Sequence, residues 1–500
     1  MGNRPASRQG SFDFDVPAPA EENGTLKTEQ VPWIIVSGDV PYFVTDNGDH
    51  WSPLGQNDAV TWPDLAGAFR RKDIVAVELY FEMLSRHGVN CLRVMLEYCH
   101  GESRYLERPA GVFQQNMVRF WDDIFPLCEK YCIRILLTPY DTFWMWRRWS
   151  HHPYNVNNNG PCAKRSQWLI CPATRAAIKN RLYFATERWG ASGALFAWDL
   201  WNEIRPSHGG NSAEGFSEFI NDISVFLRTT ELELHGRAHP QTVSVFSPVL
   251  QKDLKIAEAV FRHPSLDFAT IHLYELNSID NPKNTIAAAI TTGRLTRQVL
   301  GEIKDKRPFF DSEHGPIKTF NTSRKSLPAD FDDEYFRHMQ WAHLASGGTG
   351  GGMRWPYRHP HTLTLGMRKA QLSLSGFIRL VAWNSFDRVN INEEIVLSDK
   401  GLTAFGCADG RQAIIWLLRK DSIGKNKLLR RNVKAEPVTV FIPLLLPGSY
   451  MVTIWDTLMG FVIKSFEHVN GSAFELSLPP VQADIAVALF KGESEILFRS

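Results

Sequence analysis

Short apolar runs alternate with longer amphipathic segments over most of the chain. The short runs are rich in β-branched and aromatic residues, and the longer segments repeat apolar residues at helical spacing. This alternation is typical of a parallel sheet with helical crossovers, and eight such pairs predict a closed (β/α)₈ TIM barrel. The expected strands lie near 51–55, 90–95, 133–138, 195–200, 242–247, 268–273, 309–312 and 350–355. The expected helices lie at 75–87, 113–131, 174–189, 213–231, 252–262, 285–304, 333–346 and 368–383.

The pattern differs at both ends of this region. Residues 1–30 are polar and contain no apolar run, so we expect a flexible N-terminal tail without a secretory signal. Two β-type runs at 33–36 and 42–45 predict a hairpin that plugs the floor of the barrel. After about residue 390, period-2 runs separated by turn signals predict a C-terminal antiparallel β-sandwich. The expected organisation is therefore a tail (1–30), a (β/α)₈ barrel with its hairpin (31–389) and a β-sandwich domain (390–500).

Composition and charge narrow the class of protein. Of the 500 residues, 44% are apolar and 22% are charged, which suits a chain that buries a large core. The 55 basic and 54 acidic side chains give a net charge of +1, which removes the electrostatic basis for a nucleic-acid or anionic-membrane partner. The seven cysteines show no CxxC pair and no zinc-site spacing, so we expect reduced thiols and no metal. With neither a signal peptide nor a membrane span, a cytoplasmic protein is expected.

Two glutamates follow the expected fourth and seventh strands. The letters WNE end the fourth strand at Glu203, and SEHG places Glu313 at the end of the seventh. Active sites of (β/α)₈ barrels lie at the carboxyl ends of the strands, so the two carboxylates are expected to face each other across the mouth. Glycosidic cleavage requires such a pair: one group protonates the leaving oxygen, and the other attacks the anomeric carbon or activates water.

The two motifs resemble those of glycoside hydrolase clan A, and most of all the family 5 cellulases and mannanases. WNE is similar to the family's acid/base signature and SEHG to its nucleophile signature, which implies Glu203 as acid/base and Glu313 as nucleophile. The resemblance implies a retaining β-glycoside hydrolase that works by double displacement through a covalent glycosyl-enzyme intermediate. It also implies a carbohydrate partner and no metal or organic cofactor.

Further positions match the same family. Arg93 corresponds to the strand-two arginine that supports the nucleophile, and Asn202 is placed to donate to the sugar 2-hydroxyl. His272 and Tyr274 form the His-x-Tyr motif after strand six, where the tyrosine is expected to bond the nucleophile. Trp355 corresponds to the strand-eight tryptophan that offers an apolar face to the sugar.

The third strand departs from the family pattern. The family's histidine is missing there, because residues 137–141 read LTPYD. The long segment 140–174 that follows is rich in aromatic and basic residues, and from it we take Tyr140 and Trp144 as candidate substrate contacts. One interpretation of this segment is a wall over the sugar subsites that accepts a polar or acidic sugar. Packing of the segment onto the barrel is an equal alternative.

The carboxylate pair also predicts a charge effect. The anionic Glu313 is expected to raise the pKa of Glu203 by like-charge repulsion, and Arg93 is expected to lower the pKa of Glu313. Two other functions remain open: a transglycosylase, in which an acceptor sugar replaces water, and a non-catalytic carbohydrate-binding protein. The presence of both glutamates disfavours the second. The identity of the sugar, exo or endo action and the oligomeric state are not determined by these patterns.

Overall fold

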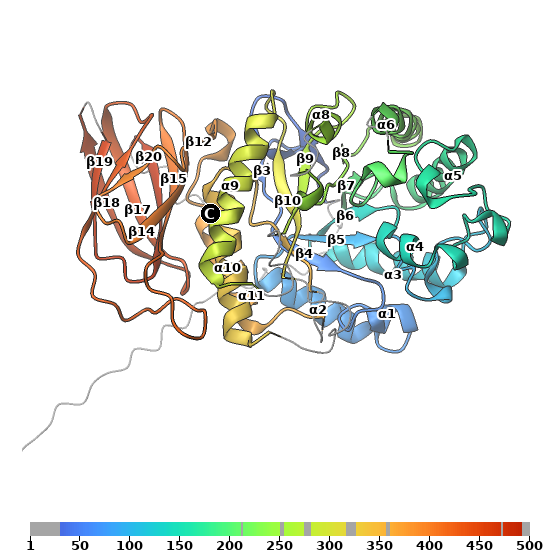
Figure 1. Cartoon of the computed structure of the whole chain (residues 1–500), viewed down its shortest axis with the longest axis horizontal. Helices are drawn as coiled ribbons and strands as arrows, with labels where there is room; N and C mark the ends of the chain where they lie inside the picture. Colours follow the sequence, from blue (N-terminus) through green and yellow to red (C-terminus); the bar gives the residue numbers. More distant parts are fainter. Residues whose placement is uncertain are drawn as a thin grey trace, which may run out of the picture. The chain divides into compact units, whose positions relative to one another are not determined.

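Eight parallel strands form a ring at the centre of the main domain (Figure 1). The computed structural model describes residues 31–211, 214–250, 255–274, 282–316, 327–356, 361–471 and 474–492, so the expected tail at 1–30 lies outside the described residues. The ring order is β8-β7-β6-β5-β4-β11-β10-β9, and a parallel bridge between Phe246 and His272 joins its two ends. Its strands are β4 (Gly55–Asp58), β5 (Cys91–Met95), β6 (Arg134–Thr138), β7 (Leu195–Asp199), β8 (Gln241–Thr242), β9 (Ala269–Leu273), β10 (Phe309–His314) and β11 (Met353–Arg354). The expected (β/α)₈ barrel is confirmed.

Helices connect these strands and surround them in Figure 1. The longer ones are α2 (Ile74–Arg86), α3 (Gln115–Lys130), α5 (Pro172–Trp189), α6 (Glu214–His235), α8 (Lys255–Phe261), α9 (Thr285–Glu302), α10 (Ala329–Ala345) and α11 (Leu365–Ile378). Short helices α1 (Ala66–Arg70), α4 (Thr142–Arg147) and α7 (Ser247–Leu250) lie in the loops after β4, β6 and β8. Side chains cap several of them: Asp73 accepts from the backbone at the start of α2, and Asn284 does so for α9.

The first barrel strand differs from the expectation. It was expected near 51–55, but β4 begins at Gly55 and its sequence is GQND. All four residues are buried, and their polar groups are hydrogen-bonded: Gln56 donates to Tyr80 at 2.7 Å, and Tyr80 donates to Asp58 at 2.9 Å. A polar strand of this kind has no apolar run to reveal it, because internal hydrogen bonds replace the apolar contacts.

A three-stranded antiparallel sheet covers the amino-terminal end of the barrel. It consists of β1 (Ile34–Val36), β2 (Phe43–Thr45) and β3 (His50–Trp51), and its register pairs Ile34 with Thr45. Phe43 packs edge-on against Phe196 and Phe268, at ring distances of 4.9 and 5.2 Å. These phenylalanines lie at the beginnings of barrel strands or just before them, so the sheet closes the barrel opposite its carboxyl end.

The C-terminal strands form two packed antiparallel sheets, which confirms the expected β-sandwich. One sheet has the order β12 (Val389–Asn390), β14 (Leu402–Ala408), β15 (Gln412–Arg419), β20 (Asp484–Lys491), β17 (Gly448–Asp456) and β18 (Phe461–Asn470). The other has the order β13 (Val396–Leu397), β16 (Val438–Ile442) and β19 (Phe474–Leu478). Alternating buried residues of both sheets make the core of the sandwich.

The sandwich packs against the barrel through α10 and α11. Trp341 and Phe377 from these helices share one buried cluster with Phe405, Trp416 and Trp455 of the sandwich. The helices of the described segments include none that is both long and apolar enough to cross a membrane.

Candidate active site

The two candidate carboxylates meet at the mouth of the barrel. Glu203 follows β7, Glu313 lies in β10, and His272 of β9 stands between them. His272 Nδ1 lies 3.1 Å from Glu203 Oε1 and 3.5 Å from Glu313 Oε2. One oxygen of each carboxylate and a ring nitrogen of His272 all lie within 4.8 Å of one another. The structure therefore places these three predicted residues in one cluster.

Arg93 of β5 forms an ion pair with the Glu313 carboxylate. Its Nη1 lies 3.0 Å from Glu313 Oε2 and 2.9 Å from Asn57 Oδ1. Its Nη2 donates to Asp199 Oδ2 at 2.7 Å and to Asn202 Oδ1 at 2.6 Å. The arginine is completely shielded from solvent, and charge-assisted hydrogen bonds of this kind fix a carboxylate in place. Asp199 and Asn57 are site residues that the sequence motifs did not identify.

Asp199 extends this network to the backbone of Glu203. Its carboxylate accepts from the amide and the hydroxyl of Ser244, each at 2.9 Å. Ser244 Oγ in turn accepts from the amide of Glu203 at 3.1 Å. Glu203 has φ 50°, a left-handed conformation that is uncommon for a residue with a side chain. The network thus supports a strained turn that directs the Glu203 carboxylate into the mouth.

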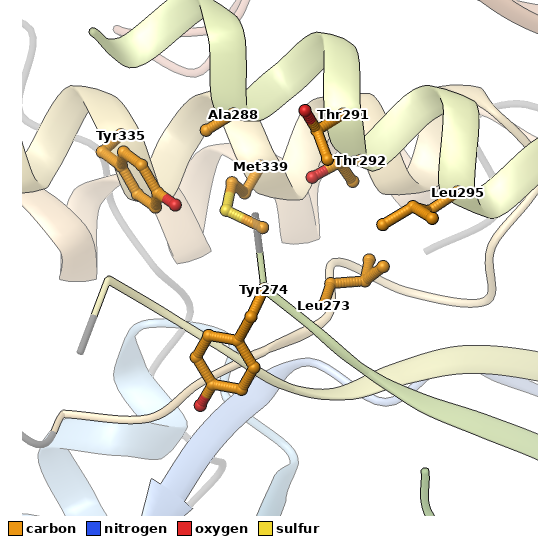
Figure 2. Close-up of a pocket in the computed structure, with 8 residues that line it drawn as sticks. All are labelled: Leu273, Tyr274, Ala288, Thr291, Thr292, Leu295, Tyr335 and Met339. Carbon is orange, nitrogen blue, oxygen red and sulfur yellow. The ribbon is translucent and has the colours of Figure 1, made fainter. Parts of the chain in front are cut away.

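Tyr274 bonds the other oxygen of Glu313. Its hydroxyl donates to Glu313 Oε1 at 2.5 Å. Burial, and after it the charge of Glu313, raise the pKa of Tyr274 well above its usual value, so the phenol keeps its proton. Figure 2 shows the ring pointing away from α9 and α10, with its hydroxyl at the far end. A narrow gap behind the ring is lined by Leu273, Leu295 and Met339 among others, and it has no room for a water molecule. We assign it no ligand.

Asn202 is oriented from two sides. Its Oδ1 accepts from Arg93, and its Nδ2 donates to Thr142 Oγ1 at 3.0 Å. The Thr142 hydroxyl donates back to the Asn202 carbonyl at 2.7 Å. One hydrogen of the Asn202 amide group remains to bond a ligand. Thr142 was not identified from the sequence.

The expected pKa effect is wrong for Glu203. Burial raises the pKa of this carboxyl, but a hydrogen bond from His272 and the charges of His272, Arg205 and Arg93 lower it to about 2. Arg205 Nη2 lies 2.8 Å from Glu203 Oε2, so a positive charge that no sequence motif marks stabilises the Glu203 anion. The pKa of Glu313 is raised: burial is the largest cause, Glu203 adds to it, and His272 and Arg93 only partly oppose it. In the free site the proton therefore binds Glu313 more readily than Glu203.

Trp355 and Trp144 lie at the rim. The Trp355 amide donates to the carbonyl of His314 at 2.7 Å, and its half-buried ring packs edge-on against Trp62 at 4.9 Å. The half-buried Trp144 ring contacts the ring of His100 at 4.4 Å. Both tryptophans keep part of their surface accessible, as a sugar platform requires.

Tyr140 does not take part in the site. It is fully buried, its hydroxyl lies 2.8 Å from that of Tyr154, and the Arg181 guanidinium stacks over its ring at 4.1 Å. Its ring packs against Trp201 at 5.4 Å. The expected substrate contact is corrected to a packing role, because these neighbours cover every polar and apolar surface of the side chain.

Asp141 occupies the end of the third strand instead. Its carboxylate accepts from the amides of Trp144 and Cys99 at 3.1 and 3.2 Å. Burial raises the pKa of Asp141 to about 7, and the charges of Glu97 and Glu313 contribute to the rise. The side chain therefore titrates near neutral pH within the electrostatic field of the nucleophile candidate.

Two groups in the described segments have ligand types that suit a metal ion. They are Glu203 with His272 and Glu313, and Glu97 with Cys99 and His152. Arg93 and Arg205 already place positive charge against the first group, and Arg181 lies 3.0 Å from Glu97 in the second. These guanidinium groups oppose a divalent cation at either place.

The barrel thus places one carboxylate just after its fourth strand and a second in its seventh strand, and an arginine of the second strand bonds the latter. No family model and no curated protein matches the sequence. A solved structure of a family 5 glycoside hydrolase from Bacteroides vulgatus is similar, with a TM-score of 0.60, 11% identity, and coverage of 94% of this chain and 95% of that one. Another, described as a glycoside hydrolase, has a TM-score of 0.59 and 13% identity, and covers 93% of this chain and 98% of its own. The chain thus has the fold of family 5 glycoside hydrolases, with barrel and sandwich both included.

Proposed function

We propose that this protein is a retaining β-glycoside hydrolase that acts on a carbohydrate, with Glu313 as nucleophile and Glu203 as acid/base. The observation that carries the proposal is the approach of one oxygen of each carboxylate to within 4.8 Å, on either side of His272. Retaining enzymes hold their two carboxyl groups about 5 to 5.5 Å apart, whereas inverting enzymes keep about 6.5 to 9.5 Å to admit a water molecule. The short separation supports direct attack on the sugar.

The first chemical step forms a glycosyl-enzyme ester. A carboxylate oxygen of Glu313 attacks the anomeric carbon, while Glu203 gives its proton to the glycosidic oxygen and the C–O bond breaks. Arg93 and Tyr274 hold the nucleophile in position, and Asn202 donates to the sugar 2-hydroxyl. In the second step Glu203 takes a proton from water, and the water oxygen displaces Glu313 from the sugar.

Glu203 must carry a proton for the first step. In the proposed mechanism, the glycosidic oxygen replaces Arg205 at Oε2, which removes one cation and a hydrogen bond from the carboxyl. The pKa of Glu203 then rises, because a nearby positive charge no longer stabilises the anion. The proton that Glu313 binds more readily in the free site then passes to Glu203, which leaves Glu313 anionic for the attack and Glu203 protonated for transfer to the leaving group.

The test is hydrolysis of a panel of aryl β-glycosides by the wild-type protein and by Glu313→Ala. The variant is expected to lose turnover by a factor on the order of 10⁴ or more, and azide is expected to restore it with an α-glycosyl azide as product. Glu82→Ala, on an exposed face of α2, is the matched control and should keep full activity.

A mechanism-based 2-fluoroglycoside provides the second readout. It should label Glu313 and leave the Glu313→Ala protein unmodified, as peptide mass spectrometry will show. Wild-type turnover in Glu313→Ala would refute the assignment. Binding of sugars without turnover or labelling in the wild type would indicate a carbohydrate-binding protein instead.

A further inference from the structure

One wall of the barrel mouth carries a cluster of arginines. Arg70 ends α1, Arg104 lies in the loop after β5, and Arg148 caps the carboxyl end of α4. Arg104 Nη1 lies 3.2 Å from His100 Nδ1, and Arg148 Nη1 donates to the His100 carbonyl. We call Arg70, Arg104 and Arg148 the arginine cluster. Because β4, β5 and β6 are neighbours in the ring, the cluster occupies one continuous side of the mouth.

The arginine cluster has no acidic partner within the described segments. None of its members forms an ion pair there, whereas Arg108 in the same loop pairs with Glu102 at 3.5 Å. Burial lowers the pKa of the half-buried Arg104, and the charges of Arg70 and Arg148 lower it further. The chain has a net charge of only +1, so this local excess of positive charge is not a consequence of composition. Positive charges held close together without a counter-charge repel one another, and a bound anion lowers this electrostatic repulsion.

An aromatic path leads from the candidate active site to the arginine cluster. From Trp355 the ring contacts run to Trp62 at 4.9 Å, then to Tyr98 at 6.1 Å and to His100 at 6.2 Å. Trp144 continues the path beyond His100, at 4.4 Å. Trp62 and Tyr98 are buried, whereas the rings at the two ends keep accessible surface. The accessible faces of Trp355 and Trp144 suit the apolar faces of sugar units, and the buried rings between them hold this wall in place.

His100 is neutral and has a defined tautomer. An arginine can only donate, so the His100 Nδ1 must accept from Arg104 and its proton must sit on Nε2. Burial, with Arg104 and Arg148, lowers the pKa of His100 and keeps the ring uncharged. The ring can therefore donate to a sugar oxygen while the guanidinium groups supply the charge.

We propose that this wall binds a sugar unit with an anionic substituent, namely a uronate carboxylate, a sulfate ester or a phosphate ester. Guanidinium groups match such planar or tetrahedral oxyanions with paired hydrogen bonds. This inference rests on the proposed hydrolase function. It implies that the substrate is an acidic oligosaccharide, whose charged unit lies along the wall of the mouth that carries Trp355 and Trp144.

The test is a binding titration that does not depend on turnover. Glu313→Ala protein is titrated with β-1,4-linked mannuronate tetramer and with mannotetraose, which differ only in the carboxylate at C6. Glucuronate tetramer and cellotetraose give the same comparison for sugars of the gluco configuration. The 6-sulfated and 6-phosphorylated forms of the neutral sugars show which anion is preferred. At least one charged ligand should bind about tenfold or more tightly than its neutral counterpart, with an affinity that falls as salt is added.

Substitutions of single arginines show which side chains cause the preference for the charged ligand. Arg104→Gln and Arg148→Gln, each combined with Glu313→Ala, should abolish the preference for the charged ligand, so that the charged and the neutral sugar bind with similar affinity. Arg86→Gln on the exposed face of α2 is the matched charge control and should keep the preference. Equal binding of charged and neutral sugars, a preference insensitive to both substitutions, or absence of binding by every charged ligand would overturn the proposal. Turnover of neutral glycosides alone would overturn it as well, while leaving the proposed hydrolase function intact.

Discussion

His272, Arg205 and Arg93, in that order, lower the pKa of the proposed acid/base residue Glu203. Arg205 contacts one oxygen of Glu203, and His272 contacts the other. Arg93 adds a positive charge, and the carboxyl groups of Glu203 and Glu313 repel each other when both are ionised. With its pKa lowered to about 2, Glu203 loses its proton as pH rises through that range. The first chemical step needs protonated Glu203, so kcat/KM, which reports on the free enzyme, should be higher in acidic solution.

Replacing Arg205 by Gln should move the alkaline limb of the kcat/KM profile upward by about 1 pH unit, since one cation no longer stabilises the Glu203 anion. The measurement is kcat/KM against pH with a glycoside whose leaving group needs protonation. Arg205→Lys keeps the charge and should retain the wild-type limb. A limb that stays in place in Arg205→Gln would show that this guanidinium does not control the proton on Glu203.

At the scale of single residues, the sequence predicts those that belong to short motifs at strand ends. Glu203, Glu313 and Arg93 come together because each follows or lies within a buried strand whose direction is already set by the barrel. Asp199 and Ser244 were not identified, because each is a single polar residue in a buried segment and no motif marks it. Their roles appear only when distant strands align their side chains around Arg93 and the Glu203 amide.

The amino-terminal sheet shows how one element stabilises several others. Phe43 is fully buried and packs against aromatic rings before or within three barrel strands, Phe196, Phe268 and Phe310. On the neighbouring strand Ile35 is 40% exposed. The contrast between these two positions gives a matched pair for measuring the contribution of the sheet.

Phe43→Ala should lower the free energy of unfolding by about 3 to 5 kcal/mol, because it removes a large side chain from a packed core and leaves a cavity. Ile35→Ala should change it by no more than about 0.5 kcal/mol. Urea unfolding followed by tryptophan fluorescence measures both. Similar small effects for the two variants would mean that the sheet contributes little to the stability of the barrel.

Element prediction succeeded where apolar periodicity was strong and failed where polarity concealed a strand. The run LFAWD at β7 is buried throughout and is recognisable as a strand. GQND at β4 is equally buried but satisfies its polar groups internally, so hydropathy alone places the strand too early. Tyr140 was also misinterpreted, because it lies two residues beyond β6, where no strand periodicity fixes its direction, and its side chain faces a buried network instead of the mouth.

At the scale of the whole molecule, one buried ion pair joins the sandwich to the barrel. Arg337 of α10 donates to Asp484 of β20, and Trp416 Nε1 and the Thr457 hydroxyl bond the same carboxylate. Burial opposes ionisation, but Arg337 and then His338 hold the pKa of Asp484 well below its usual range. The two partners are 147 positions apart, and no local pattern in the sequence links them.

Asp484→Asn should destabilise the protein by about 3 to 5 kcal/mol at pH 7, because Arg337 remains buried without its counter-charge. A carboxyl whose folded pKa is depressed contributes stability above its unfolded pKa of about 4 and loses that contribution as the pH falls toward the folded value. The gap in melting temperature between variant and wild type should therefore narrow below about pH 4.

Asp421→Asn serves as the control, since Asp421 is exposed and lies 3.4 Å from Arg419. It should shift the melting temperature little at any pH. A gap for Asp484→Asn that is constant with pH would mean that ionisation of Asp484 does not stabilise the junction.

The position of the amino-terminal sheet has a consequence for the order of folding. β1 to β3 precede every barrel strand in the chain, yet their buried cluster includes Phe196, Phe268, Phe310 and Met353. During synthesis the sheet emerges first, but its last partner appears some three hundred residues later, when β11 has been made. This sheet must therefore wait for the barrel to assemble before it docks, and until then its apolar face is a surface that a chaperone can recognise.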